Sequence, residues 1–199
     1  DFVEPGDRLR GGDRERCGYM NWGELRALEA DPLFEVEPHG VDHARVPTSA
    51  RSTGRLTAAN WRRHAWMQWA ATDGPKHDWH RLALPVAVPL GSEIPESGLA
   101  LAATAWRDGA RETAADLATR VAGHLSLCRS AFERELGRTP QVFCWPENAA
   151  VEEGRRIASA LGYRATTGGR RRNAADEPPA VISRIHMGDR AIGLRWLAV

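Results

Sequence analysis

The chain has 199 residues, a length that suits one domain with a substantial buried core. Lysine and arginine total 27 against 26 aspartate and glutamate, for a net charge of +1. This balance argues against a dedicated nucleic-acid-binding protein, which carries a large basic excess. No apolar run approaches the ~20 residues that span a membrane. The three cysteines, with no CxxC pair, exclude a disulfide framework and disfavour a cysteine zinc site.

The N-terminal part of the chain combines loops with one helix and one strand. Residues 1–20 are polar and glycine-rich and are predicted to form a loop. Asn21, with Glu24 three residues later, has the spacing of a capping box and predicts the start of a short helix. Residues 33–38 alternate between apolar and other side chains, which predicts a half-buried strand. Residues 44–56 are rich in Thr, Ser, Arg and Gly and are predicted to form a loop.

The middle of the chain is less regular until its longest helix. Residues 57–72 place tryptophans at helical spacing and predict a helix. Residues 82–90 are apolar but contain two prolines, so we expect an edge strand or an extended connection there, followed by a turn at 94–98. In residues 111–136 apolar side chains recur every three or four positions, which predicts a helix that Gly137 closes.

The C-terminal part alternates strands with helices. Short strands are predicted at residues 141–145 and 163–167, on either side of a helix at 150–161, and another strand is expected at 181–182. Because strands separated by helices pair in parallel, the chain is expected to have an α/β architecture. We expect a single domain in which residues 44–110 form a long insertion.

The strongest chemical signal is a pair of histidines four residues apart. His39 and His43 follow the predicted strand at 33–38 directly, and ligands of α/β folds gather at the carboxyl ends of strands. Two imidazoles leaving one strand end can hold a divalent cation, which activates water. Gly40 permits a tight turn beside them, and Asp42 either orients a ring or faces solvent. The competing interpretation is that two of the seven histidines fall at this spacing by chance.

A second segment, residues 143–148, runs from a predicted strand into Trp-Pro-Glu-Asn. Trp145 at the end of the strand is a candidate for stacking on a sugar ring, and Glu147 and Asn148 are candidates for hydrogen bonds to hydroxyl groups. The alternative is a buried tryptophan followed by a helix that Asn148 caps.

Tryptophans are also dense between residues 61 and 79. They form either a sugar-binding platform or part of the core on one helix face. The four residues concerned are Trp61, Trp66, Trp69 and Trp79.

Taken in order, these segments resemble the polysaccharide deacetylases of carbohydrate esterase family 4. Residues 22–25 and 34–43 are similar to that family's second motif, in which a helix leads into a strand and a His-x-x-x-His loop. Residues 144–148 are similar to its third motif, and residues 161–166 to its Gly-Tyr-strand element. Residues 182–186 resemble a segment of the branch that acts on poly-N-acetylglucosamine-like exopolysaccharides.

The resemblance implies a distorted (β/α) barrel and a divalent metal, usually zinc, held by one Asp and two His. His39 and His43 match the two histidines. It further implies that an Asp takes the proton of the attacking water and that a late His protonates the leaving amine. His186 is the candidate for the late His, and the alternative is a surface residue at a strand end. The implied substrate is an N-acetylated polysaccharide or oligosaccharide, and the implied location is the periplasm or the cell exterior.

The chain departs from the family pattern at several positions. The family's Thr-Phe-Asp-Asp motif, which supplies the base and the Asp ligand, is not present, and Asp1 and Asp7 stand in the wrong context. We therefore expect a barrel that is incomplete at its N-terminus, or a lineage that has lost catalysis. Gly40 replaces a Ser or Thr, Cys144 replaces a common Arg, and Glu147 replaces a common aromatic residue.

Three functional hypotheses follow. The first is a metal-dependent hydrolase that removes N-acetyl groups from a polysaccharide. The second is a non-catalytic carbohydrate-binding or scaffold domain on the same fold. The third is a different metal hydrolase that completes its site with Asp42 or His186.

Overall fold

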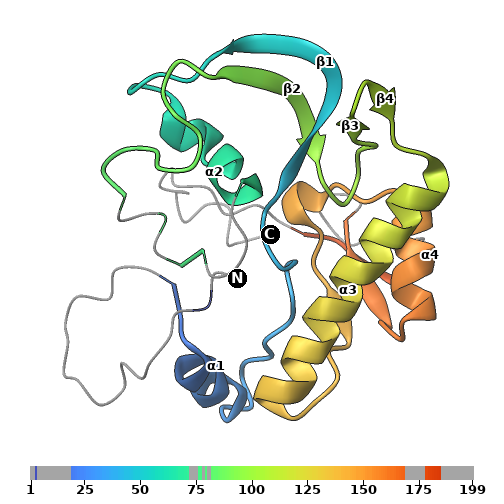
Figure 1. Cartoon of the computed structure of the whole chain (residues 1–199). Coiled ribbons are helices and arrows are strands. Elements are labelled where there is room, and N and C mark those ends of the chain that lie inside the picture. Colours follow the sequence, from blue (N-terminus) through green and yellow to red (C-terminus); the bar gives the residue numbers. More distant parts are fainter. Residues whose placement is uncertain are drawn as a thin grey trace, which may run out of the picture.

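The computed structural model describes residues 3, 19–71, 76–77, 79, 82–168 and 178–184. Figure 1 shows two regions: an arch of two long strands with a short helix beneath it, and the two longest helices, which pack against each other. The predicted loop at 1–20 lies almost wholly outside the described residues, and so does His186. Within the described residues no helix is long and apolar enough to cross a membrane.

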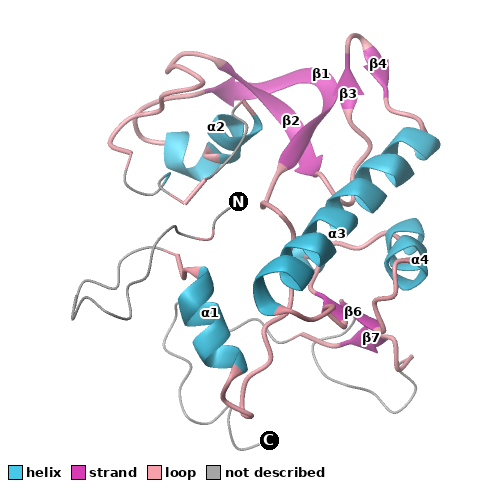
Figure 2. Cartoon of the chain, turned by 60° about the horizontal axis from the view of Figure 1, so that its bottom comes forward, coloured by secondary structure: helices cyan, strands magenta, loops and turns pink. Residues whose placement is uncertain are grey.

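A three-stranded parallel sheet forms one end of the molecule (Figure 2). Its strands are β5 (Val142–Phe143), β6 (Ala165–Thr167) and β7 (Val181–Ile182), in that spatial order. Helix α4 (Glu152–Ala160) connects β5 to β6. The predicted strands and the predicted parallel pairing are confirmed here, although the strands are shorter than the sequence pattern indicated.

Helix α3 (Ala114–Leu136) packs against α4 and against α1. It begins after Thr113, whose side chain forms a capping box with Asp116, and it ends at Gly137, which has a φ of 69°. The helix predicted at 111–136 is thus confirmed, with its start moved by three residues to Ala114, directly after the capping Thr113. Its buried face consists of Val121, Leu125, Cys128 and Phe132.

The main hydrophobic core lies between this face of α3 and the parallel sheet. Phe143 and Trp145 are fully buried there, with ring centroids 4.8 Å apart and an edge-on orientation. Tyr163 joins them, and its hydroxyl donates a hydrogen bond to the Leu125 carbonyl of α3. The core therefore joins β5 and the start of β6 to the middle of the long helix.

The strand predicted at 33–38 does not form, although the helix before it does. Helix α1 (Trp22–Glu29) has the predicted capping box between Asn21 and Glu24. After it, the carboxylate of Glu37 accepts hydrogen bonds of 3.1 Å from the backbone amides of Gln141 and Val142. A side chain thereby occupies donors that a neighbouring strand would use, and the prediction of a regular strand was wrong.

The segment at 44–110, which we expected to be an insertion and call the insertion below, contains long strands where loops and turns were predicted. Strand β1 (Arg45–Arg55) pairs antiparallel with β2 (Glu93–Leu99), so the loop at 44–56 and the turn at 94–98 were wrong. Most of β1 is exposed, which explains its polar composition, and register shifts accommodate the prolines.

Two further predictions in this segment need correction: the single continuous helix at 57–72, and the edge-strand alternative for 82–90. The helix predicted at 57–72 divides into a 3-10 helix, η2 (Trp61–His64), and a short helix, α2 (Trp66–Ala70). Residues 82–90 form no strand, because Gln68 Oε1 accepts hydrogen bonds from three consecutive amides of this segment, at residues 86–88. The segment therefore wraps around one buried side chain instead of pairing with a strand.

A hairpin of β3 (Trp106–Arg107) and β4 (Ala110–Arg111) leads into α3. Its turn is Asp108-Gly109, both with positive φ, which is a strong hairpin signal that the sequence predictions missed. The described residues thus form a mixed α/β fold with two-, two- and three-stranded sheets. In this part of the chain no closed barrel is found.

Candidate active site

The candidate site lies where the three parallel strands end. Cys144 follows β5, and its amide donates a hydrogen bond of 2.9 Å to the carbonyl of Pro38. Pro38 directly precedes residues 39–43, which we call the histidine loop. Thr167 ends β6 and accepts a hydrogen bond from the Trp145 amide. Arg184, two residues beyond β7, places Nη1 3.1 Å from Cys144 Sγ. The carboxyl ends of three strands therefore converge on the segment that carries the histidine pair, as expected for α/β folds.

His39 and His43 lie side by side at this edge. Their ring centroids are 5.3 Å apart, with an interplanar angle of 54°, and both side chains are partly buried. Two imidazoles that bind one tetrahedral ion through nitrogens at ~2.1 Å have centroids about 5 Å apart. The spacing of the rings therefore suits a shared divalent cation.

A hydrogen bond fixes the tautomer of His39. Its Nδ1 lies 2.8 Å from the carbonyl oxygen of Cys144, which only accepts, so in the neutral ring Nδ1 carries the proton and Nε2 keeps its lone pair. Protein metal sites use this arrangement to orient a histidine ligand. Hydrogen bonding to the Cys144 side chain raises the pKa of His39 against the effect of burial. Burial, followed by the charge of His39, lowers the pKa of His43 and favours its neutral, ligating form.

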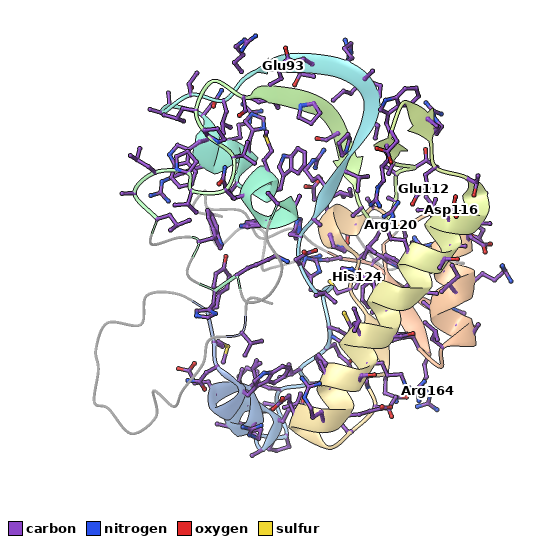
Figure 3. All side chains as sticks on the ribbon, in the orientation of Figure 1. Glu93, Glu112, Asp116, Arg120, His124 and Arg164 are labelled. Carbon is purple, nitrogen blue, oxygen red and sulfur yellow. The ribbon has the colours of Figure 1, made fainter. Side chains whose placement is uncertain are left out.

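Helix α3 holds the histidine loop from behind. His124 Nε2 accepts a hydrogen bond of 2.7 Å from the amide of Val41 (Figure 3). Gly40 has a φ of +103°, and a Cβ built there would lie 3.2 Å from His124 Nε2. The sequence predictions missed His124, yet a signal existed: it lies three residues after Val121 and four before Cys128, on the apolar face of the predicted helix.

The side chain of Asp42 forms hydrogen bonds with Lys76 and with the Ala44 amide instead of with a histidine ring. Its Oδ2 accepts a hydrogen bond of 2.9 Å from Lys76, and its Oδ1 accepts one of 3.2 Å from the amide of Ala44. Of the two expected roles, orienting a ring or facing solvent, the structure shows neither. In the described segments no group of three His, Cys, Asp or Glu side chains is arranged to hold a metal.

The three predicted sugar-binding residues after β5 differ in their exposure to solvent. Trp145 is 0% exposed and offers no face to a ligand, which supports the alternative of a core tryptophan. Glu147 and Asn148 have positive φ values of 52° and 56°, an unusual pair that costs of order 1–3 kcal/mol for each residue. Such strain clusters at functional sites. The side chain of Glu147 is 57% exposed, whereas Asn148 has a buried Oδ1 without a hydrogen-bond partner and does not cap α4.

A cavity of about 470 Å³ opens beside His43. This volume lies within the range of about 300–1,000 Å³ that small-ligand sites occupy. Trp69 and Trp79 line it, with centroids 5.3 Å apart and edge-on packing, so part of the dense tryptophan group does reach a ligand-sized space. Trp61 and Trp66 are 3% and 7% exposed and belong mainly to the core of the insertion.

No protein-family model matches the chain, and no curated protein matches it significantly. Among solved structures, it is similar to the BpsB deacetylase domain from Bordetella bronchiseptica, with a TM-score of 0.56 and 18% identity. It is also similar to a de-N-acetylase from Aggregatibacter actinomycetemcomitans, with a TM-score of 0.53 and 16% identity. Each match covers 84% of this chain and 48% of the other, so the chain spans about half the length of these neighbours. The similarity shows that the chain has a deacetylase-like α/β fold.

Proposed function

We propose that the chain is a metal-dependent polysaccharide N-deacetylase of the distorted (β/α) barrel type, in which His39 and His43 are two of the metal ligands. One observation carries the proposal: the ring centroids of His39 and His43 lie 5.3 Å apart at the carboxyl ends of parallel strands. The hydrogen bond between His39 Nδ1 and the Cys144 carbonyl leaves Nε2 of the neutral ring available to bind a metal. The deacetylase-like fold supports the reaction class. The substrate we propose is an N-acetylated polysaccharide. From the family resemblance we also propose the periplasm or the cell exterior as the location.

The residues present fit a divalent cation, zinc by the family resemblance, with His39 and His43 as two of its ligands. Catalytic zinc usually has three protein ligands, and the resemblance implies an aspartate as the third. When bound, the metal polarises a substrate carbonyl and lowers the pKa of a coordinated water. The hydrolysis converts an N-acetyl group and water into a free amine and acetate.

The chain's own residues contribute positioning. The hydrogen bond from Val41 to His124 keeps the histidine loop at the strand ends, and the Cys144 carbonyl keeps His39 in one tautomer. Trp69 and Trp79 offer aromatic surface to a sugar ring, and Glu147 offers a carboxylate to a hydroxyl group. We assign protonation of the leaving amine to His186 from the family resemblance alone.

Metal analysis of the purified protein tests the proposal. We expect weak zinc binding that His39→Ala and His43→Ala each abolish, while His64→Ala, from the lining of the same cavity, retains it. Zinc should also raise the thermal midpoint of the parent and of His64→Ala but not of the two other variants. A parent that binds no zinc and unfolds identically with and without chelator would falsify the proposal.

The second candidate is a non-catalytic carbohydrate-binding domain on the same fold. The cavity walls favour it independently of any metal, since Trp69 and Trp79 contribute aromatic surface there. Acetate release separates the two candidates. Zinc-dependent release from chito-oligosaccharides or a β-1,6-linked N-acetylglucosamine oligomer supports the enzyme, whereas saturable binding without release supports the binding domain.

A further inference from the structure

Thr167, the last residue of β6, places a buried hydroxyl group beside the end of β5. It is 8% exposed, and its Oγ1 accepts a hydrogen bond of 2.9 Å from the amide of Trp145. Trp145 is 0% exposed, so its amide has no access to water and depends on this acceptor. A side chain of β6 therefore completes the backbone hydrogen bonding just beyond β5.

The amide that Thr167 accepts belongs to the same peptide unit as the carbonyl that orients His39. The peptide bond between Cys144 and Trp145 is planar, and its C=O and N–H groups point in opposite directions. Thr167 Oγ1 lies 2.9 Å from the nitrogen on one side, and His39 Nδ1 lies 2.8 Å from the oxygen on the other. One rigid plane thus connects Thr167 to His39, and a rotation of that plane would break both hydrogen bonds.

Further contacts fix the two residues that this plane joins to the sheet. The side chain of Cys144 shares a hydrogen bond with that of Thr167, and its amide donates to the Pro38 carbonyl at 2.9 Å. Thr167 lies on the central strand of the parallel sheet, and its carbonyl accepts a hydrogen bond of 3.4 Å from Arg155 of α4. The hydroxyl is therefore held by regular secondary structure on both sides.

We propose that Thr167 is a positioning residue for the metal ligand His39. Its hydroxyl holds the peptide between Cys144 and Trp145 so that the carbonyl accepts the Nδ1 proton and Nε2 of the neutral ring stays available to the metal. The inference deepens the proposed function and rests on its assignment of His39 as a ligand. Without the hydroxyl, the buried Trp145 amide has no acceptor, which favours rotation of the peptide away from His39.

Thr166 offers a matched control at the preceding position of the same strand. It is 5% exposed, and its Oγ1 accepts a hydrogen bond of 3.0 Å from Arg155. Successive side chains of a strand point to opposite faces, so its hydroxyl serves α4 and not the peptide behind His39. A valine at either position removes one buried, hydrogen-bonded hydroxyl with little change of shape.

Zinc titration calorimetry compares the parent with three variants. We expect Thr167→Val to bind zinc about tenfold more weakly, the lower end of what the loss of a partner that orients a histidine ligand costs. Thr167→Ser, which keeps the hydroxyl, and Thr166→Val should bind zinc as the parent does. Thermal melts should show similar losses of stability for the two valine variants. Equal zinc affinity of Thr167→Val and the parent, or equal weakening in Thr167→Ser or Thr166→Val, would overturn the inference.

A measurement without metal separates this inference from the proposed function. In apo protein with isotope-labelled histidine, long-range proton–nitrogen NMR correlations at alkaline pH show which ring nitrogen carries the proton, and His39→Ala assigns the His39 signals. We expect the Nδ1–H form of His39 in the parent, Thr167→Ser and Thr166→Val, and a mixture of both tautomers in Thr167→Val. Should Thr167→Val not fold, Thr167→Ala gives the same comparison. A parent that binds no zinc would refute the metal site, whereas a parental tautomer in the variant without the hydroxyl would refute the role of Thr167.

Discussion

Lys76 donates a hydrogen bond of 2.9 Å to Oδ2 of Asp42, and the two side chains are only 8% and 15% exposed. Lys76 is the one lysine in the sequence, and it belongs to the long insertion. Asp42 lies between the candidate ligands His39 and His43. This nearly buried ion pair therefore ties the insertion to the loop on which the proposed chemistry depends.

Breaking this pair should destabilise the protein strongly. We expect Lys76→Met to lower the free energy of unfolding by about 3 kcal/mol, because it leaves a desolvated carboxylate without its partner. Asp42→Asn should have a similar effect, and the double variant should lose less than the two single losses together. Urea denaturation measures all three, and Arg156→Ala, which removes an exposed pair with Glu153, should change little. Strict additivity of the two single losses would contradict direct coupling.

Two glycines offer a matched test of the histidine loop. Gly40 has a φ of +103° and a close approach to His124, so Gly40→Ala should lower stability by about 1–3 kcal/mol and weaken zinc binding. Gly123 lies inside α3 with open space around a built Cβ, so Gly123→Ala should raise stability by about 0.5–1 kcal/mol. Thermal melts and zinc titrations compare the two. Similar behaviour of the two variants would show that the Gly40 conformation is not required.

The sequence was informative wherever one local signal decided the structure. The capping box of Asn21, the apolar stripe that ends at Gly137, and the strand-helix-strand order from residue 141 onward all rest on nearby residues. The histidine pair was found in the same way, because its spacing and its place after an apolar stretch are local. Its juxtaposition with Cys144 also agrees with the rule that sites lie at the carboxyl ends of parallel strands.

The failures share a different cause, since distant side chains replaced the expected backbone pairing. The Glu37 carboxylate accepts hydrogen bonds from the amides of Gln141 and Val142, at the start of β5. Gln68 accepts those of residues 86–88, and no periodic pattern in the sequence indicates either interaction. The exposed strand β1 looks like a loop because solvent allows polar residues there, and only its partner β2 makes it a strand. Trp145 was ambiguous because an apolar ring serves a core and a sugar equally well until burial is known.

A bidentate ion pair at the start of α3 should make stability depend on acidity. Arg120 contacts both carboxylate oxygens of Glu112, at 2.9 and 2.6 Å, and Glu112 also accepts the amide of Ala105 (Figure 3). The hydrogen bond from Arg120 lowers the pKa of Glu112 despite burial. Because the folded pKa is depressed, the stabilisation is present above the ordinary value of 4.5 and is lost as pH falls through the folded pKa.

The variant Glu112→Gln isolates this contribution. At pH 7 we expect it to be less stable than the parent by about 2 kcal/mol, the size of a lost charge-assisted hydrogen bond in a buried site. The gap should narrow as pH falls below 4.5. Guanidinium unfolding curves across this range provide the measurement, and a gap that stays constant with pH would show that the carboxylate charge is not responsible.

His124 is a base whose pKa is lowered in the folded protein, whereas Glu112 is an acid whose pKa is lowered. Burial lowers the pKa of His124, and Arg120 and Lys76 lower it further against the opposing charge of Asp42. As pH falls below the ordinary histidine pKa of 6.5, His124 becomes protonated in the unfolded chain but stays neutral in the folded one. The free energy of unfolding therefore declines until the pH reaches the pKa of His124 in the folded protein. Protonated Nε2 also cannot accept the Val41 amide, so the histidine loop loses its attachment to α3.

Two substitutions separate titration from hydrogen bonding at this position. His124→Gln keeps a side-chain acceptor but does not titrate, so its stability should fall less than that of the parent between pH 7 and pH 5. His124→Leu removes the acceptor and should cost about 1–3 kcal/mol at pH 7, because the Val41 amide is left unsatisfied. Since the lowered pKa values of His43 and His64 contribute to the slope in every variant, the difference between parent and His124→Gln isolates His124. Parallel pH profiles for these two proteins would mean that the histidine loop is held by something other than a neutral His124.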